Sequence, residues 1–274
     1  MSTERRVQFE YPPDITPVWT PRFPELSAAA NGVSLLMPYV EPYVVTSVRS
    51  VLDELDPELR VTARAFIAQE TQHHVQHRRF NALLIPQVPG LERVEGWMQR
   101  TYGWLARRRS SRFGLAFAAA FETVAFALAR WTESHMRQLF DGADAQVTTL
   151  FLWHLAEEVE HKAVAFDVYQ QIDGSRLRYL RAGAVAVVLL SWFTLFSTLT
   201  MLRAQRRLLH PVVWWRLIVW GTSLAFEVLP NLFVSAMPSH HPNDFADPSV
   251  LTNWLSYYDP ETRTMPLWWT GTAA

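Results

Sequence analysis

Apolar residues recur every three to four positions along most of the chain, and no stretch of alternating β-branched residues competes with this pattern. Such spacing is typical of helices that bury one face. It predicts helices over residues 33–55, 57–84, 111–140 and 145–172, with a shorter one within residues 90–110. Pro86, Gly142 and Gly174 follow three of these segments as stop signals. The pattern therefore indicates an all-α protein.

The segments around these helices divide the chain into parts. Residues 1–30 hold five prolines and no periodicity, which predicts an extended lead-in on the surface. Residues 31–175 form the expected helical bundle, and residues 176–237 are strongly apolar. Residues 238–274 are rich in proline and aromatic residues, which predicts an irregular tail over the bundle.

The apolar part contains two long stretches. Residues 182–202 carry no charged side chain over 21 positions, enough to cross the hydrocarbon core of a bilayer. The second stretch, residues 211–237, is interrupted by Arg216 and Glu227. Two interpretations stay open, a membrane hairpin or helices packed on the bundle or on a partner subunit. The first implies contact with the inner face of a membrane, and the second allows a homodimer.

Composition and charge exclude several classes. The 274 residues are 49% hydrophobic, which suits a large buried core. The formal net charge is −1 without a basic stripe, so we expect no nucleic-acid partner. The chain has no cysteine, so any metal must be bound by nitrogen and oxygen. Residues 1–17 lack the apolar run of a secretory signal, which predicts a cytoplasmic protein.

Candidate chemistry is concentrated in QETQHHVQHRRFN, residues 69–81. At about 100° per residue, Glu70, His73 and His77 share one narrow helix face. Phe66 lies on the same face one turn earlier, so this face is expected to point inward. Buried glutamate and imidazole need partners, and a divalent cation bound by Glu-x-x-His from adjacent turns supplies one. His74 lies to the side and is expected to be structural.

The same spacing occurs again in WHLAEEVEHKAVAFDVY, where Glu158 and His161 repeat it. Glu122 is the only carboxylate in the apolar segment SRFGLAFAAAFETVAFALARW. Glu41 is the only charge in LLMPYVEPYVVTSV, where a proline on either side predicts a kink or a helix start. Glu157 is expected behind the site or on the surface, and Lys162 is expected to face solvent.

Together these residues follow the ligand scheme of ferritin-like dinuclear carboxylate bundles: a glutamate from each of two helices and Glu-x-x-His from each of two others. Such a set suits two iron ions, or manganese. His154 and His77 lie toward one end of the predicted site. They could add a ligand, hold a third ion or orient a ligand carboxylate, or they could be hydrogen-bonded core histidines. The predicted fold is a ferritin-like four-helix bundle with additional apolar C-terminal helices.

The two motifs resemble a bacterial family described as predicted metal-dependent hydrolases, and the similarity extends over nearly the whole chain, including HHP at residues 240–242. The ligand arrangement is also similar to that of ferritin-like diiron oxygenases and oxidases. His154, Glu158 and His161 resemble a triplet of the diiron arylamine N-oxygenases, in which the extra histidine binds iron. The family description implies hydrolysis, whereas the second resemblance implies a diiron enzyme.

Three functions follow from these observations. The first is oxidation of a small apolar or lipid-like substrate by a diiron site that uses dioxygen as co-substrate. The second is hydrolysis of an ester or phosphoester, with His77 or His154 as a base. The third is a non-catalytic role as a metal store or a membrane scaffold. Apolar walls and the abundance of carboxylates favour the first, largely by analogy of fold.

Overall fold

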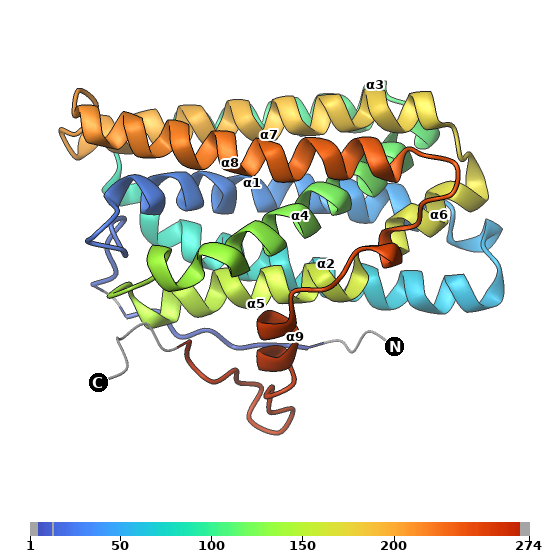
Figure 1. The fold of residues 1–274 in the computed structure, drawn as a ribbon, viewed down its shortest axis with the longest axis horizontal. Helices are drawn as coiled ribbons and strands as arrows, with labels where there is room; N and C mark the ends of the chain where they lie inside the picture. Colours follow the sequence, from blue (N-terminus) through green and yellow to red (C-terminus); the bar gives the residue numbers. More distant parts are fainter. Residues whose placement is uncertain (1–4, 13, 269–274) are drawn as a thin grey trace.

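The structure is a computed structural model that describes residues 5–12 and 14–268. These residues form long α-helices and contain no β-strand beyond an isolated bridge between Asp259 and Thr264 (Figure 1). The all-α prediction is therefore confirmed. Residues 1–4, 13 and 269–274 lie outside the described part, and with them the ends of the predicted lead-in and tail.

Four helices carry the predicted site residues. They are α1 (Pro24–Arg49), α2 (Pro57–Leu84), α4 (Ser111–Leu139) and α5 (Ala145–His161). α1 packs on α2 and α4, and α5 packs on α4 and α2, so the four enclose a common interior. Short 3-10 turns, Leu52–Glu54 and Ile85–Gln87, close the ends of α1 and α2. The ferritin-like connection of these helices stays a prediction.

The first helix starts earlier than predicted, at Pro24 rather than at residue 33. Proline suits the first turn, because its missing N–H would have no partner there. The preceding segment is tied to the helix, since Trp19 Nε1 donates to Asn31 Oδ1 at 2.8 Å and the Thr20 amide donates to Ser27 Oγ at 2.9 Å. The extended lead-in therefore ends before residue 24 and not at residue 30.

The predicted single helix over residues 145–172 is two helices, because α5 ends at His161 and α6 (Val164–Ile172) follows. Lys162 lies at the break and is buried, so its predicted exposure was wrong. Its Nζ donates to the Phe245 carbonyl and the Asp247 carboxylate and lies over the Phe126 ring. Two of these partners come from the tail, so local spacing could not reveal them.

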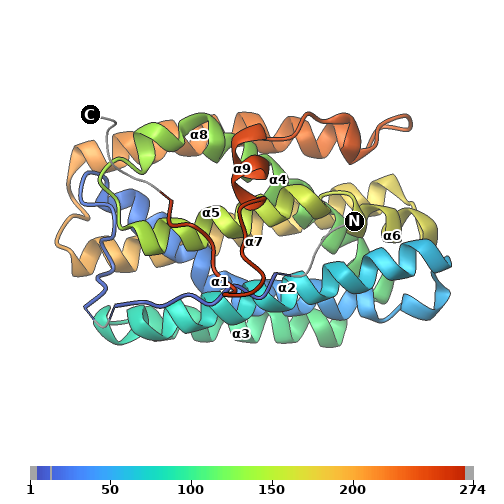
Figure 2. The same ribbon diagram turned by 90° about the horizontal axis from the view of Figure 1, so that it is seen from below.

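The apolar segments form an outer layer along the upper edge of Figure 1, made of α7 (Arg176–Ala204) and α8 (Pro211–Ser235). Both pack on α4, and α7 also packs on α1 and α3 (Leu91–Arg108). Figure 2 shows α3 and α8 along opposite edges of the molecule. The tail lies on the other side, where α9 (Ser249–Leu255) packs on α5.

Both charges that interrupt the second apolar stretch face the bundle. Arg216 donates to buried Glu25 of α1 at 2.9 Å, and Glu227 pairs with Arg130 of α4 at 3.2 Å. The hairpin therefore packs on the bundle. By length and composition alone, three of the described helices, α4, α7 and α8, could still cross a membrane. In the most apolar 18-residue part of each helix, 78% of the residues are buried for α4, against 33% for α7 and 17% for α8.

Close packing of α1 on α7 depends on Gly32. A Cβ at this position would lie 3.0 Å from Ser197 Cβ and 3.1 Å from the Thr194 carbonyl oxygen. We expect Gly32→Ala to lower the free energy of unfolding by about 1–3 kcal/mol, because the α7 backbone has to shift. Gly221→Ala in α8 is the matched control, since its Cβ meets nothing within 4 Å, and a gain of about 0.5–1 kcal/mol is expected. Chemical denaturation measures both, and equal stability of the two variants would contradict the assigned contact.

Candidate metal centre

Carboxylates and imidazoles from α1, α2, α4 and α5 meet in the interior. His154 is 8% exposed and the others are at most 2% exposed; the set is Glu41, Glu70, His73, Glu122, His154, Glu158 and His161. Aromatic rings form the nearby walls, with Phe66 edge-on to His161 and Trp153 edge-on to His73, each at 5.0 Å between ring centroids. The structure thus brings seven of the eight predicted ligands into one apolar enclosure.

Two overlapping groups of ligand atoms are each close enough together to hold a cation. Glu70, His73, Glu158 and His161 offer atoms within 4.8 Å of one another, and so do Glu41, His73 and His154. In the first group, Glu70 Oε1 lies 3.3 Å from His161 Nε2 and 3.4 Å from His73 Nδ1. Glu122 adjoins this group, with Oε2 3.1 Å from His161 Nδ1. His73 belongs to both groups, so the two positions are neighbours.

Several of the potential ligand atoms make no hydrogen bond among the described residues. These atoms are Glu41 Oε1 and Oε2, Glu70 Oε1, His73 Nδ1, Glu122 Oε1, Glu158 Oε2 and His161 Nε2. A buried polar atom without a partner costs about 1–3 kcal/mol, and more when it is charged. Native proteins rarely leave several together. A pair of divalent cations supplies the missing partners, so the residues present fit a dinuclear metal centre.

The charges of the buried carboxylates also favour bound divalent cations. Burial, together with repulsion from Glu70 and other carboxylates, raises the pKa of Glu41 and of Glu122 well above the ordinary value of 4.5. Burial alone would also raise the pKa of Glu158, but the charge of His161 and contacts with other histidines hold it well below that value. Glu41, Glu70, Glu122 and Glu158 would together carry four negative charges when ionised. Two divalent cations balance that charge, and neutral histidines complete the coordination.

Glu157 lies behind the cluster and fixes the orientation of His73. The two side chains are fully buried, and His73 Nε2 lies 2.9 Å from Glu157 Oε2. When Nε2–H donates to this carboxylate, Nδ1 is left to face Glu70 and Glu158. Arg5 supports Glu157 from the lead-in, with Nη1 at 3.4 Å, and also pairs with Glu160. The sequence left open whether Glu157 lies behind the site or on the surface, and the structure places it behind the site.

The two prolines of α1 create acceptors that side chains of α2 satisfy. Pro38 and Pro42 lack an N–H, so the carbonyls of Ser34 and Pro38 lose their helical donors. Asn81 Nδ2 donates to the Ser34 carbonyl at 2.8 Å, and Arg78 lies 3.4 Å from the Pro38 carbonyl. Glu41 lies between the prolines, within a continuous helix. The carbonyls left without helical donors therefore connect α1 to side chains of α2 near this ligand. The helix does not start at either proline.

A chain of hydrogen bonds continues from Asn81 to the cluster. Because Asn81 Nδ2 donates to a carbonyl, Asn81 Oδ1 is the acceptor for the Ser34 hydroxyl at 2.7 Å. Ser34 Oγ then accepts from His77 Nδ1 at 2.8 Å, and His77 Nε2 accepts from His154 Nδ1 at 2.7 Å. His154 Nε2 is left with a lone pair, 2.7 Å from Glu158 Oε1. Two acceptors this close need a cation or a proton between them.

This relay favours the hydrogen-bonded role of His77 over its predicted role as a metal ligand, which stays a prediction. Both ring nitrogens of His77 are engaged in this structure, with Ser34 and with His154. Burial and the neighbouring His154 lower the pKa of His77 well below its ordinary value, which agrees with a neutral ring. His74 is half-buried and contacts the carbonyl of Glu70, outside the cluster, where it was expected. Ser34 was not among the predicted site residues. Its position four residues before Pro38 was a usable signal, because its carbonyl lacks a helical donor.

The family model described as "Predicted metal-dependent hydrolase" matches residues 3–246. The chain belongs to this family. No match was found among curated proteins or among solved structures. The resemblance seen in the two motifs is confirmed, and the buried groups that could hold metal agree with a metal-dependent hydrolase family.

Glu41 gives a test of the balance between stability and metal binding. Its pKa is raised in the folded protein, so its carboxyl destabilises the metal-free fold increasingly as pH rises above 4.5. Glu41→Gln should therefore raise the melting temperature of the metal-free protein at neutral pH, and this gain should shrink toward pH 4.5. The same substitution should reduce the melting-temperature gain on metal loading. Thermal denaturation with and without metal measures both effects.

The matched control is Glu25→Gln, because Glu25 is a buried glutamate of the same helix that pairs with Arg216. It should lower the melting temperature in both states and leave the metal content unchanged. A Glu41→Gln protein that is destabilised without metal, or that keeps the full metal-dependent gain, would contradict the assigned role.

Ser34→Ala tests the hydrogen-bond relay. Without Oγ, His77 Nδ1–H loses its acceptor, and the ring orientation that directs the His154 lone pair is no longer fixed. We expect metal affinity at one of the two positions to fall by about 10–100-fold. Ser47→Ala is the control, because this buried serine of α1 donates to its own helix at the Tyr43 carbonyl. Isothermal titration with Mn²⁺ measures the affinities, and an unchanged affinity in Ser34→Ala would contradict the relay.

Proposed function

We propose that this protein hydrolyses an ester or phosphoester at a dinuclear metal centre. The observation that carries the proposal is the cluster of buried ligand atoms that make no hydrogen bond, in a member of a family described as predicted metal-dependent hydrolases. Glu41, Glu70, His73, Glu122, Glu158 and His161 would hold the two ions. When bound, such ions lower the pKa of water and polarise a carbonyl or phosphoryl oxygen.

The chain's own residues have separate tasks in this reaction. Glu157 holds His73 in place, and the relay through His77 directs the His154 lone pair toward Glu158 and Glu41. That lone pair can serve a cation or accept a proton from attacking water. His154 is the most exposed member of the cluster, at 8%, so we propose that substrate reaches the centre from its side. Rings such as Phe66 and Trp153 favour a small apolar or lipid-like substrate.

Oxidation by two iron or manganese ions, with dioxygen as co-substrate, is the second candidate. A specific observation favours it: the carboxylates and the imidazoles of His73 and His161 are at most 2% exposed, in an apolar enclosure that excludes water. Such enclosure protects reactive oxidants from side reactions. Association with a membrane belongs to either proposal, because a lipid-like substrate is found there.

One experiment separates the two reactions. Protein stripped with chelator is reloaded without oxygen with Zn²⁺, Mn²⁺ or Fe²⁺ and offered p-nitrophenyl esters and phosphodiesters. We expect metal-dependent release of p-nitrophenol without oxygen uptake, lost in Glu158→Gln and kept in the control Glu95→Gln on α3. Uptake of dioxygen by the Fe²⁺ protein without ester cleavage would replace hydrolysis by oxidation. Neither activity in a metal-loaded protein would contradict both candidates.

A further inference from the structure

We infer that the outer face of α7 and α8 docks on an anionic lipid bilayer, with both helices lying along the bilayer surface and not across it. The inference deepens the membrane association proposed above by naming the surface, the lipid charge and the orientation. It does not depend on which reaction the metal centre catalyses.

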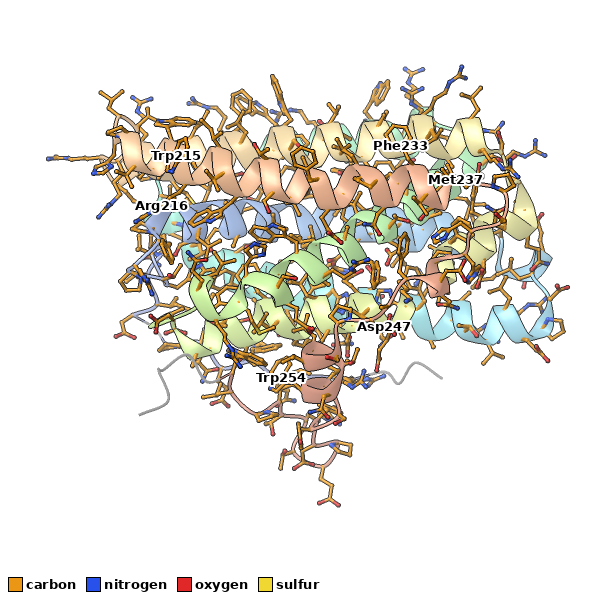
Figure 3. The ribbon with its side chains drawn as sticks, viewed as in Figure 1. Trp215, Arg216, Phe233, Met237, Asp247 and Trp254 are labelled. Carbon is orange, nitrogen blue, oxygen red and sulfur yellow. The ribbon has the colours of Figure 1, made fainter. Side chains whose placement is uncertain are left out.

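An apolar stripe runs along the whole outer side of α8. Its members repeat at helical spacing and are 43–76% exposed: Val212, Trp215, Ile218, Val219, Phe226, Leu229 and Phe233. Figure 3 shows Trp215 and Phe233 near the two ends of this helix. Exposed Gly221 and Thr222 lie between its two halves. An apolar stripe of this length on one helix is unusual for a surface that meets only water.

α7 and the turn after it extend the apolar surface. Val188, Trp192 and Leu195 of α7 are 44–62% exposed, and Leu209 in the turn is 92% exposed. Trp97 of α3 packs against Phe196 at the edge of the same layer, where Arg93 and Arg203 line a shallow groove. Tryptophan beside arginine is typical of side chains at the boundary between lipid tails and headgroups.

The positive charge of the α7 and α8 layer favours an anionic partner. Residues 175–226 contain seven arginines and no aspartate or glutamate, although the whole chain has a net charge of −1. Two of the seven have carboxylate partners: Arg178 pairs with Asp173, and Arg216 pairs with Glu25 of α1. The other five are exposed at the two ends of α7: Arg176, Arg181, Arg203, Arg206 and Arg207. Arginines around an apolar face suit anionic headgroups.

A second copy of the chain fits this face poorly. A two-fold dimer would set the same patch against itself, so the exposed arginines of one copy would lie near those of the other. Anionic phospholipids supply both the apolar contact and the opposite charge. The face is therefore assigned to lipid and not to a homodimer.

The packing of the layer indicates the orientation. α7 is held at Gly32 near one end, where a Cβ would meet Ser197, and at Gly183 near the other, where a Cβ would meet Ala120 and Leu232. α8 is held through Arg216 and Glu227. A crossing hairpin would have to leave these contacts, whereas a hairpin lying flat keeps them. Arginines at both ends of α7 then reach headgroups of the same leaflet.

Vesicle flotation of the full chain tests the partner. We expect the protein to float with vesicles of phosphatidylcholine and phosphatidylglycerol, less with phosphatidylcholine alone, and less at high salt. Phe226→Asp should weaken binding by at least about tenfold, because a charge replaces an inserted ring. Val61→Asp on α2 is the control, since Val61 is 60% exposed outside this face. Unchanged metal content in both variants shows that they are folded.

Single labels test the orientation, and the absence of cysteine in the chain makes them simple to place. An environment-sensitive fluorophore is attached to Val212→Cys, Val219→Cys or Phe233→Cys, and lipid-borne quenchers report its depth. A flat helix gives similar, shallow depths at all three positions. A much deeper middle position would overturn the flat orientation. Absence of vesicle binding, or a dimer that Phe226→Asp converts to a monomer, would overturn the lipid assignment whether or not the enzyme assay succeeds.

Discussion

The cost of burying several carboxylates in an apolar interior is the constraint on which this structure depends. Glu41, Glu70, Glu122 and Glu158 come from four helices and converge in the interior, where each is at most 2% exposed. An ionised carboxylate without a partner is among the most unfavourable groups a protein core can hold. Cations would remove that cost, and the four helices that contribute these carboxylates would then enclose a metal centre. The rest of the molecule either orients these ligands or covers them.

Orientation depends on groups that do not themselves face the centre. Glu157 fixes His73 from behind, and the relay from Asn81 through Ser34 and His77 fixes the tautomer of His154. The relay begins with a carbonyl that Pro38 leaves without its helical donor. Pro38 looks unfavourable within α1, but it leaves the Ser34 carbonyl free to accept from Asn81 of α2, and this bond aligns the two helices. The outer layer of α7 and α8 closes the other side of α1 and α4.

The residues that sequence analysis could find are those whose relation is local. The helices and both Glu-x-x-His pairs depend on spacing within one segment, and their side chains do converge. Partners distant in the sequence could not be found in this way. Glu157 meets Arg5 across 152 positions, and Lys162 meets Asp247 across 85. Hydropathy likewise could not decide how the second apolar stretch packs, because Arg216 and Glu227 pair with residues of other helices.

The central claim is that the buried cluster is a two-ion centre. The centre is tested most directly by the metal content of the protein. Chelator-treated protein is reloaded with Fe²⁺, Mn²⁺ or Zn²⁺, freed of excess metal and measured by elemental analysis. The account predicts two ions per chain for at least one of these metals. Less than one ion per chain with all three, in protein that is folded, would contradict it.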